Sequence, residues 1–154
     1  MSAVACLSAA AVYVSADGTP TSGIAVPSPS AEAATLCGRL HDALPRRVDG
    51  LSARTLSPVS TLTAGWGDPT VVLRCGVPRP ETLTPGSTTY NPGADAVDVN
   101  GVSWLMERTG DGYRFTTTDR ATFVEVSVPA TYAPEVNPLA DLGNAVEKSI
   151  PSEL

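Results

Sequence analysis

The sequence predicts an α+β fold: an antiparallel sheet of four to five strands, with two helices packed on one face and one disulfide. Three observations predict it. Two segments, 30–44 and 138–148, carry apolar residues at helical spacing. Between them, short runs rich in β-branched residues alternate with Gly, Pro and Asn-Gly turns. Cys37 and Cys75 lie in the same region, and a chain of 154 residues has room for one such domain.

Residues 1–16 form an uncharged N-terminal segment, and Asp17 is the first charged residue of the chain. Because a bilayer span takes about 20 apolar residues, the segment is short for a membrane helix. Its small residues and the triplet VSA at Val14–Ala16 resemble the end of a secretory signal, although no Lys or Arg precedes them. We interpret the segment as signal-like or as a truncated membrane anchor. A buried N-terminal helix and a lipid-attachment box ending at Cys6 are the alternatives.

A Pro/Ser-rich linker is predicted to follow, over residues 17–30. The run TPTSGIAVPSPS, residues 19–30, cannot bury enough apolar surface to offset the entropy of ordering it, so we expect a semi-extended tether. Residues 31–154 then form the α+β domain. A signal or anchor, a linker and a globular domain commonly follow in this order outside the cytoplasm. We therefore expect an extracytoplasmic protein that is anchored in the cell membrane or secreted.

The first predicted helix begins at its cap, Ser30, and ends before Pro45. Its apolar stripe faces the core and includes Cys37, so a strand beneath this helix can present Cys75. In an exported protein the two domain cysteines are most simply a disulfide, and closing a loop of about 38 residues would stabilise the fold by about 4 kcal/mol. Two unpaired buried thiols are the alternative. The stripe consists of Ala33, Leu36, Cys37, Leu40 and Leu44.

Strands are predicted next, from β-branched runs that turn residues delimit. The run TVVLRCGV at 70–77 lies between two prolines and is the strand that carries the second cysteine. Within 95–107, Asn100 and Gly101 separate two strand-like runs. This pair is the strongest hairpin signal of the chain, because both residues tolerate the positive φ of a type I′ turn.

Residues 113–117 and 122–128 are predicted as two further strands, separated by a turn at 118–120. They complete a four-strand antiparallel meander, to which the cysteine-bearing strand adds a fifth. The last predicted helix covers 138–148, and its apolar stripe packs beside the first helix. That stripe consists of Leu139, Leu142 and Val146.

Two motifs in the middle of the chain carry a family resemblance: WGDP at 66–69 and LRCGVP at 73–78. The chain resembles an actinobacterial family of small secreted or membrane-anchored proteins, domain of unknown function 3515, from about Ala34 to its C-terminus. The resemblance implies an N-terminal membrane segment and an extracytoplasmic domain, and it implies no activity. The short N-terminal segment without a basic flank departs from the family pattern. Further shared motifs are CGRLHDALP, VNGVSWLMER, DGYRFTTTDR, VEVSVP and YAP.

The sequence lacks the residues that several classes of function require. A net charge of −6 repels phosphate backbones, so we expect no nucleic-acid partner. No C-x-x-C occurs and His41 is the only histidine, which argues against a zinc site, and the spacing of Asp95 and Asp98 lacks the ligands of an EF-hand. Neither a G-x-S-x-G motif nor a glycine-rich phosphate loop is present. We therefore predict no catalytic residue, no metal and no cofactor.

A binding surface is predicted on the sheet face opposite the disulfide. If Cys75 points inward, its neighbour Arg74 points to the other face, where it can stack on Trp66 or Trp104. With Asp68, these side chains form the candidate surface: Trp66, Asp68, Arg74 and Trp104. The ordinary interpretation is that the cluster is mainly a folding device, and the binding surface is the sharper hypothesis.

Arginines also gather around the end of the first helix, at Arg39, Arg46, Arg47 and Arg54. In a chain of negative net charge, this local basic patch can face anionic headgroups or an acidic partner surface. A solvated rim is the ordinary alternative.

The favoured function is a non-catalytic accessory or binding module of the cell envelope, tethered to the membrane by its N-terminal segment and associated with a membrane protein complex. The alternative is a small hydrolase that acts on envelope material through carboxylates. A third hypothesis is small-ligand binding in an apolar groove lined by Trp66 and Trp104. The carboxylates available to a hydrolase are Asp68, Asp98, Glu107 and Glu125.

Overall fold

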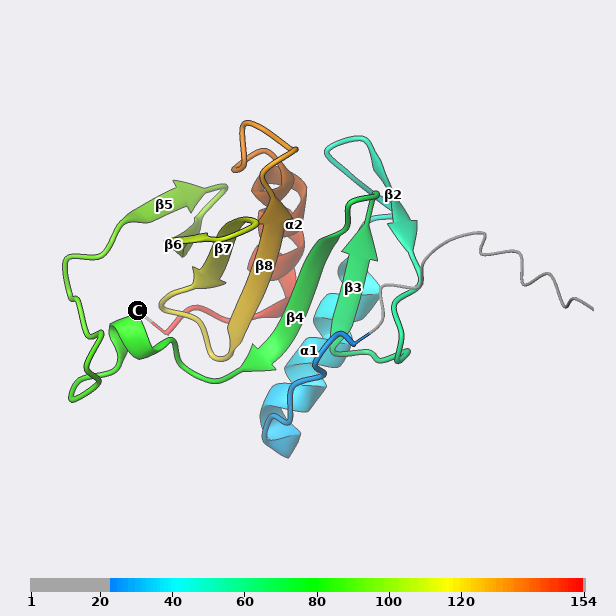
Figure 1. Ribbon diagram of the computed structural model, residues 1–154. Coiled ribbons are helices and arrows are strands. Elements are labelled where there is room, and N and C mark those ends of the chain that lie inside the picture. The colour runs from blue at the N-terminus through cyan, green and yellow to red at the C-terminus, as the bar shows by residue number, and fades with distance from the viewer. Residues whose placement is uncertain (1–22, 154) are drawn as a thin grey trace, which may run out of the picture.

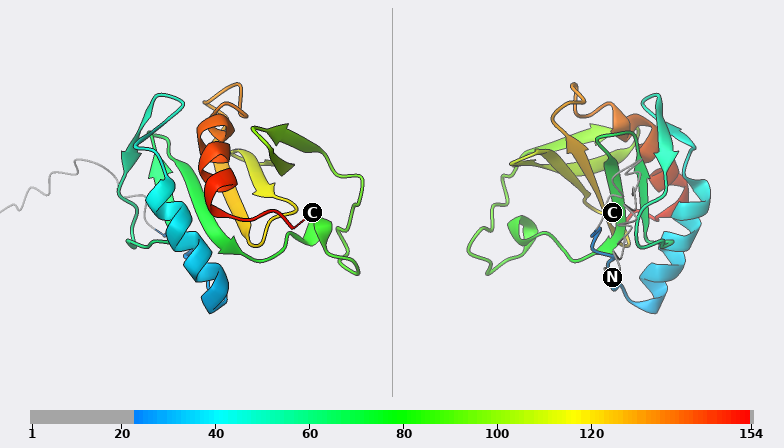
Figure 2. Two further views of the ribbon diagram at one scale, coloured as in Figure 1. Left: turned by 180° about the vertical axis from the view of Figure 1, so that it is seen from behind. Right: turned by 45° about the vertical axis from the view of Figure 1, so that its right-hand side comes forward.

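The computed structural model of the protein describes residues 23–153, so the signal-like segment 1–16 and the linker as far as residue 22 lie outside it. The fold has two layers, an eight-stranded antiparallel sheet and two helices on the same face of that sheet (Figure 1; Figure 2). The strand order is β1-β2-β3-β4-β8-β7-β6-β5, which makes β4 and β8 the central strands.

The helices are α1 (Ala31–Ala43) and α2 (Pro138–Ser149), and a short 3-10 turn, η1, covers Glu81–Leu83. The strands are β1 (Arg47–Val48), β2 (Leu51–Arg54), β3 (Thr63–Trp66), β4 (Val71–Val77), β5 (Ala96–Val99), β6 (Val102–Thr109), β7 (Gly112–Thr117) and β8 (Phe123–Pro129).

The expected sheet of four to five strands is wrong, because the chain between α1 and β4 adds three strands, β1, β2 and β3. These strands are two, four and four residues long and carry Arg, Ser, Gly and Ala where a β-branched run would be expected. So short a strand places only one or two residues on each face, and no alternation can be recognised. The other five strands and both helices correspond to the predicted segments.

Strand β4 separates the two faces of the sheet by simple alternation. Val71, Leu73 and Cys75 are buried against the helices, whereas Arg74 points to the open face. Burying each large apolar side chain of this layer contributes about 1.5–3 kcal/mol. Among the described residues, the largest fully buried side chains are Trp66, Trp104, Phe115, Leu40, Leu73 and Leu105.

The predicted disulfide is present and joins α1 to β4. The Cα atoms of Cys37 and Cys75 lie 5.6 Å apart, and both residues are buried. The predicted cap is also present, since the Ser30 Oγ accepts a hydrogen bond of 3.2 Å from the Ala33 N–H. The bridge therefore attaches the first helix to a central strand of the sheet.

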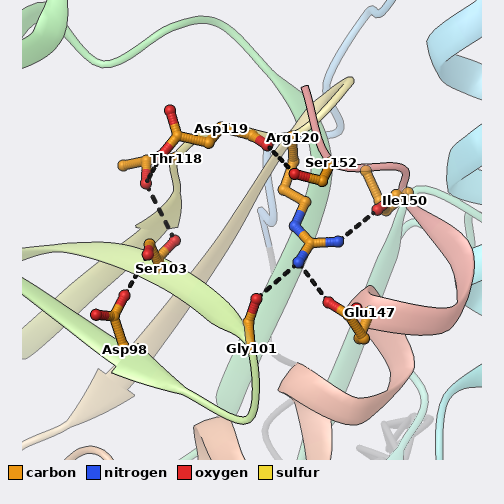
Figure 3. Close-up of polar contacts among 9 residues, drawn as sticks. All are labelled: Asp98, Gly101, Ser103, Thr118, Asp119, Arg120, Glu147, Ile150 and Ser152. Atoms are coloured by element: carbon orange, nitrogen blue, oxygen red, sulfur yellow. Dashed lines mark hydrogen bonds and ion pairs between the residues drawn. The ribbon is translucent and has the colours of Figure 1, made fainter. Parts of the chain in front are cut away.

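The predicted Asn100-Gly101 hairpin joins β5 to β6, and both residues have positive φ, 50° and 82°. It is held against the C-terminal part of the chain by Arg120, which Figure 3 shows between the hairpin and α2. The guanidinium donates to the Gly101 carbonyl at 2.8 Å and to the Ile150 carbonyl at 2.9 Å, and it forms an ion pair with Glu147. One buried side chain thus links three segments.

The structure describes residues 23–30 of the predicted linker, and within them the stretch 24–29 lies against the open face of the sheet. The Arg74 Nη1 donates to the Ala25 carbonyl at 3.0 Å. Gly76 faces the ring of Pro29, and a Cβ on this glycine would lie 2.6 Å from the Pro29 Cβ. The chain therefore contacts one face of β4 before α1 covers the other.

Candidate functional site

The four residues of the predicted binding surface do not come together. Trp66 and Trp104 are 1% and 0% exposed and belong to the helix-facing core. Trp66 lies opposite Val71 in the register, and directly opposed residues share a face. Arg74 is on the open face, so it cannot stack on either indole. Asp68 is exposed in the β3–β4 turn.

Arg74, Asp68 and Trp66 each form a hydrogen bond or an ion pair with another part of the fold, and the Trp104 indole does not. Arg74 donates two hydrogen bonds to Glu125, of 3.0 and 3.2 Å. Asp68 forms an ion pair with Arg54 at 3.4 Å, and the Trp66 Nε1 donates to the Pro45 carbonyl at 3.1 Å. The Trp104 Nε1 is buried and has no hydrogen-bond partner among the described residues.

Trp66 does line a hollow, although Trp104 does not. This hollow lies between the C-terminal end of α1, the loop 55–62 and the edge of β3, and has a volume of about 320 Å³. We call it the α1–β3 hollow. It exists because β2 pairs with β3 only through Gly65 and Trp66, and the chain then leaves the sheet after Arg54. Its main apolar lining residues are Leu44, Pro45, Leu56, Val59, Ala64 and Trp66.

The loop 55–62 forms the outer wall of the hollow. Leu56 is buried and folds back over Gly65, where a Cβ would lie 2.7 Å from the Leu56 Cδ2. Val59 on the same loop is 82% exposed. Among the described residues, only Tyr90, at 43%, is another exposed large apolar side chain, and it lies outside the hollow. The loop therefore presents an apolar residue at the rim of an apolar hollow.

Two members of the predicted arginine cluster, Arg46 and Arg54, line the same hollow. Arg54 is held in place by the Gly67 carbonyl and the Thr70 hydroxyl, in addition to Asp68. The Arg46 side chain has no hydrogen-bond or ion-pair partner within the part of the chain that the structure describes. A free cation thus borders the apolar surface.

Thr63, the first residue of β3, is a lining residue that sequence reasoning did not single out. It is only 5% exposed, yet its Oγ1 has no hydrogen-bond partner in the described chain. A buried hydroxyl without a partner costs about 1–3 kcal/mol, so its position calls for an explanation. No sequence signal identifies it, because the segment TLTAGW reads as an ordinary approach to a turn.

A second, polar hollow lies on the open face of the sheet beside the loop 78–94. It has a volume of about 340 Å³, and two of the four carboxylates considered for a hydrolase, Glu107 and Glu125, line it. All four of their oxygens are engaged: Glu125 accepts both bonds from Arg74, and Glu107 accepts from Arg114 and Thr82. The structure does not bring the other two carboxylates to this hollow.

Asp98 lies on β5 and accepts a hydrogen bond from Ser103, as Figure 3 shows. Within residues 23–153, no group of three or more His, Cys, Asp or Glu side chains is arranged to hold a metal ion. No helix in that range has both the length and the apolar character to cross a membrane.

No curated protein and no solved structure matches the chain. A family model does match, over residues 1–154, and its description is a protein of unknown function. Of the motifs that suggested this family, WGDP covers the last residue of β3 and the turn after it, and LRCGVP covers the last five residues of β4 and carries the bridged Cys75. The chain therefore belongs to the family described as protein of unknown function (DUF3515).

Proposed function

We propose that this protein is a non-catalytic, extracytoplasmic module, tethered to the membrane by its N-terminal segment, that binds a protein partner of the cell envelope. The proposal places the binding site in the α1–β3 hollow. Its apolar lining and basic rim suit a protein surface better than a nucleic acid or a metal ion.

The compartment is supported by the disulfide between Cys37 and Cys75. Such bonds form and persist in oxidising environments and are rare in the cytosol. Membrane tethering is supported by the uncharged character of residues 1–16 and by the family resemblance. Both arguments concern where the module works rather than what it contacts.

The observation that carries the binding proposal is Val59, 82% exposed at the rim of an apolar hollow. Single exposed apolar residues are common, but one that borders an apolar concavity adds to a continuous surface that water solvates poorly. A partner side chain placed there would cover Val59 and the floor at Ala64 together. A non-catalytic role is supported by the engaged oxygens of Glu107 and Glu125 in the polar hollow.

Site-specific crosslinking in the native envelope tests the proposal. We would replace Val59 with photo-reactive benzoylphenylalanine in the full-length chain and irradiate intact cells. We expect an adduct with one envelope protein. The matched control carries the same substitution at Tyr90, the exposed apolar residue outside the hollow, and should give no such adduct. No adduct from position 59, or the same adducts from both positions, would rule the proposal out.

A carboxylate-dependent hydrolase of envelope material is the second candidate, because Glu107 and Glu125 share one hollow. Catalysis by a carboxylate pair needs an oxygen that is free to protonate the leaving group, so an arginine or threonine contact would have to break. Purified chain incubated with peptidoglycan should release soluble fragments, and Glu107→Gln and Glu125→Gln should each abolish the release. No release by the native chain would end this candidate.

A further inference from the structure

We infer that the polar hollow on the open face of the sheet binds a neutral saccharide, which it holds by hydrogen bonds and does not cleave. The inference goes beyond the proposed function and does not depend on it, because this hollow shares no lining residue with the α1–β3 hollow. Its volume of about 340 Å³ suits a small ligand, since such pockets span about 300–1,000 Å³. Three features carry the inference: the balance of charge, the hydrogen-bonding groups that remain free, and an apolar wall beside them.

The first feature is the balance of charge in the floor of the hollow. Glu125 is paired with Arg74, and Glu107 accepts from the Arg114 Nε at 3.3 Å, so the two pairs together carry no net charge. An anionic ligand would meet both carboxylates, and also the exposed Glu81 at the rim. A cationic ligand would have to compete with donors that already engage both oxygens of Glu107 and of Glu125. The hollow therefore suits a neutral ligand.

The second feature is that the floor still offers donors and acceptors. Arg114 uses only its Nε–H for Glu107, and neither of its Nη groups has a partner among residues 23–153. Thr116 is 2% exposed, and its hydroxyl also lacks a partner in that range. This hydroxyl still opens onto the hollow, because the fully enclosed side-chain atoms without a partner there belong to Thr63 and Trp104. A ligand that both donates and accepts satisfies these groups together.

All of these free groups belong to side chains. The floor strands β6, β7 and β8 are paired on both sides, so the hollow has no sheet edge to which a peptide backbone adds. A sugar instead presents neighbouring hydroxyls, each of which donates one hydrogen bond and accepts others. Two adjacent hydroxyls suit the two Nη groups of Arg114, and a third suits the Thr116 hydroxyl. The pattern of free groups thus favours a saccharide over a peptide.

The third feature is an apolar wall at the end of β4, formed by Val77, Pro78 and Pro80. Proline has no main-chain N–H, so this wall presents mainly hydrocarbon. Thr82 and Thr89, from the loop 78–94, add hydroxyls to the lining. A sugar ring has a C–H face and a rim of hydroxyls, and the hollow offers a surface for each. A small number of polar groups beside an apolar surface is the usual composition of a ligand pocket.

Five neutral disaccharides test the inference with the full-length chain: maltose, cellobiose, lactose, mannobiose and N,N′-diacetylchitobiose. The readout is the pair of Arg114 and Thr116 amide signals in a proton–nitrogen NMR spectrum, and the Val59 amide reports on the α1–β3 hollow. Two charged disaccharides serve as controls. Deacetylated chitobiose carries ammonium groups, and cellobiuronic acid carries a carboxylate.

We expect at least one neutral disaccharide to shift the Arg114 and Thr116 signals, with half-saturation at about 1–10 mM. The Val59 signal should stay in place, because Val59 does not line the polar hollow. Both charged controls should bind at least about fivefold more weakly than the best neutral disaccharide. The bound disaccharide should remain intact on prolonged incubation, whereas a hydrolase would release monosaccharides.

Variants connect the binding to the free groups of the floor. Thr116→Val keeps the side-chain shape and removes the hydroxyl, and should weaken the best disaccharide about fivefold. Arg114→Lys keeps the charge and removes the planar pair of Nη groups, and should weaken it by a similar factor. Thr109→Val is the matched control, because Thr109 lies on β6 outside the hollow, and it should leave the affinity unchanged. Urea unfolding of each variant verifies that it is folded.

The inference is overturned if none of the five disaccharides shifts the Arg114 and Thr116 signals. Unchanged affinity in both Thr116→Val and Arg114→Lys would also overturn it, and so would tighter binding of a charged control. Cleavage of the disaccharide would replace the inference by the hydrolase candidate. If a disaccharide binds but position 59 gives no crosslink, the saccharide site stands and the proposed partner site falls. A crosslink without any disaccharide binding has the opposite meaning.

Discussion

Arg120 is a charged residue in an almost fully buried position, with 7% of its side chain exposed. The fold tolerates the charge because Gly101, Glu147 and Ile150 accept hydrogen bonds from its guanidinium. The sequence does not single out this residue, since Thr118-Asp119-Arg120 reads as a surface turn between two strands. Arg120 is buried because the C-terminal segment returns beside this turn. The hydrogen bond from Arg120 to the Ile150 carbonyl joins two residues that are 30 positions apart in the sequence.

Arg120→Met is expected to lower the free energy of unfolding by about 2–4 kcal/mol, because it leaves the buried Ile150 carbonyl, the part-buried Gly101 carbonyl and Glu147 without their donor. Urea unfolding followed by tryptophan fluorescence measures the change.

The control for this prediction is Arg108→Met on β6, where the guanidinium is exposed and stacks on Tyr113. It should cost about 0.5 kcal/mol or less. Similar losses for the two variants would contradict the role assigned to Arg120.

At the scale of elements, local patterns were sufficient wherever an element is long or bounded by a strong turn. Elements were predicted at nearly their observed positions from the apolar stripe of α1, the β-branched run of β4 and the Asn100-Gly101 turn. The strands β1, β2 and β3 could not be recognised, because their pairing is decided by the neighbouring strands rather than by their own residues.

The candidate site was predictable only in part, for the same reason. The arginine cluster pointed toward this end of the molecule, and Arg46 and Arg54 do line the hollow. The hollow itself arises where β2 leaves β3 and Leu56 folds back over Gly65, and no local pattern marks either event. Trp66 does line the hollow, but it is only 1% exposed, and Trp104 lies in the core away from the hollow, so the two rings do not form the shared surface that was predicted.

The bridge between α1 and β4 leads to a prediction for these two elements. Cys37→Ala/Cys75→Ala should reduce the free energy of unfolding by up to about 4 kcal/mol, because the unfolded chain regains the entropy of a 38-residue loop. Denaturation in urea measures it. The native chain in reductant serves as the control and should approach the variant. Equal stability of the native, reduced and variant proteins would contradict a stabilising bridge.

At the scale of the whole molecule, the N-terminal part of the chain passes on both sides of one central strand. The stretch 24–29 contacts the open face at Arg74 and Gly76, and α1 then crosses the other face and bonds to Cys75. The described end of the linker is thus part of the folded domain.

Gly76→Ala should displace this stretch from the sheet. Gly76 has a φ of 86°, and the new Cβ would lie 2.6 Å from the Pro29 Cβ. We expect faster hydrogen–deuterium exchange at 24–28, measured by mass spectrometry, and a stability loss of about 1 kcal/mol from the backbone.

Gly50→Ala is the matched control for this prediction. Gly50 has a similar φ of 76°, but no atom lies within 4 Å of the position that a Cβ would take. The control should therefore lose a similar amount of stability while leaving exchange at 24–28 unchanged. Faster exchange in both variants would show that the contact with Pro29 is not what holds the stretch in place.

Under the proposed tethering, in which the N-terminal segment holds the protein at a surface, the disulfide would have a mechanical consequence. Tension applied there would travel through 24–29 and the first turns of α1 to Cys37, and from there through sulfur directly into β4. The residues that line the α1–β3 hollow all fall between 41 and 66, inside the covalent loop that this bond closes. Pulling on the tether would therefore load the middle of the sheet and leave the hollow out of the line of force.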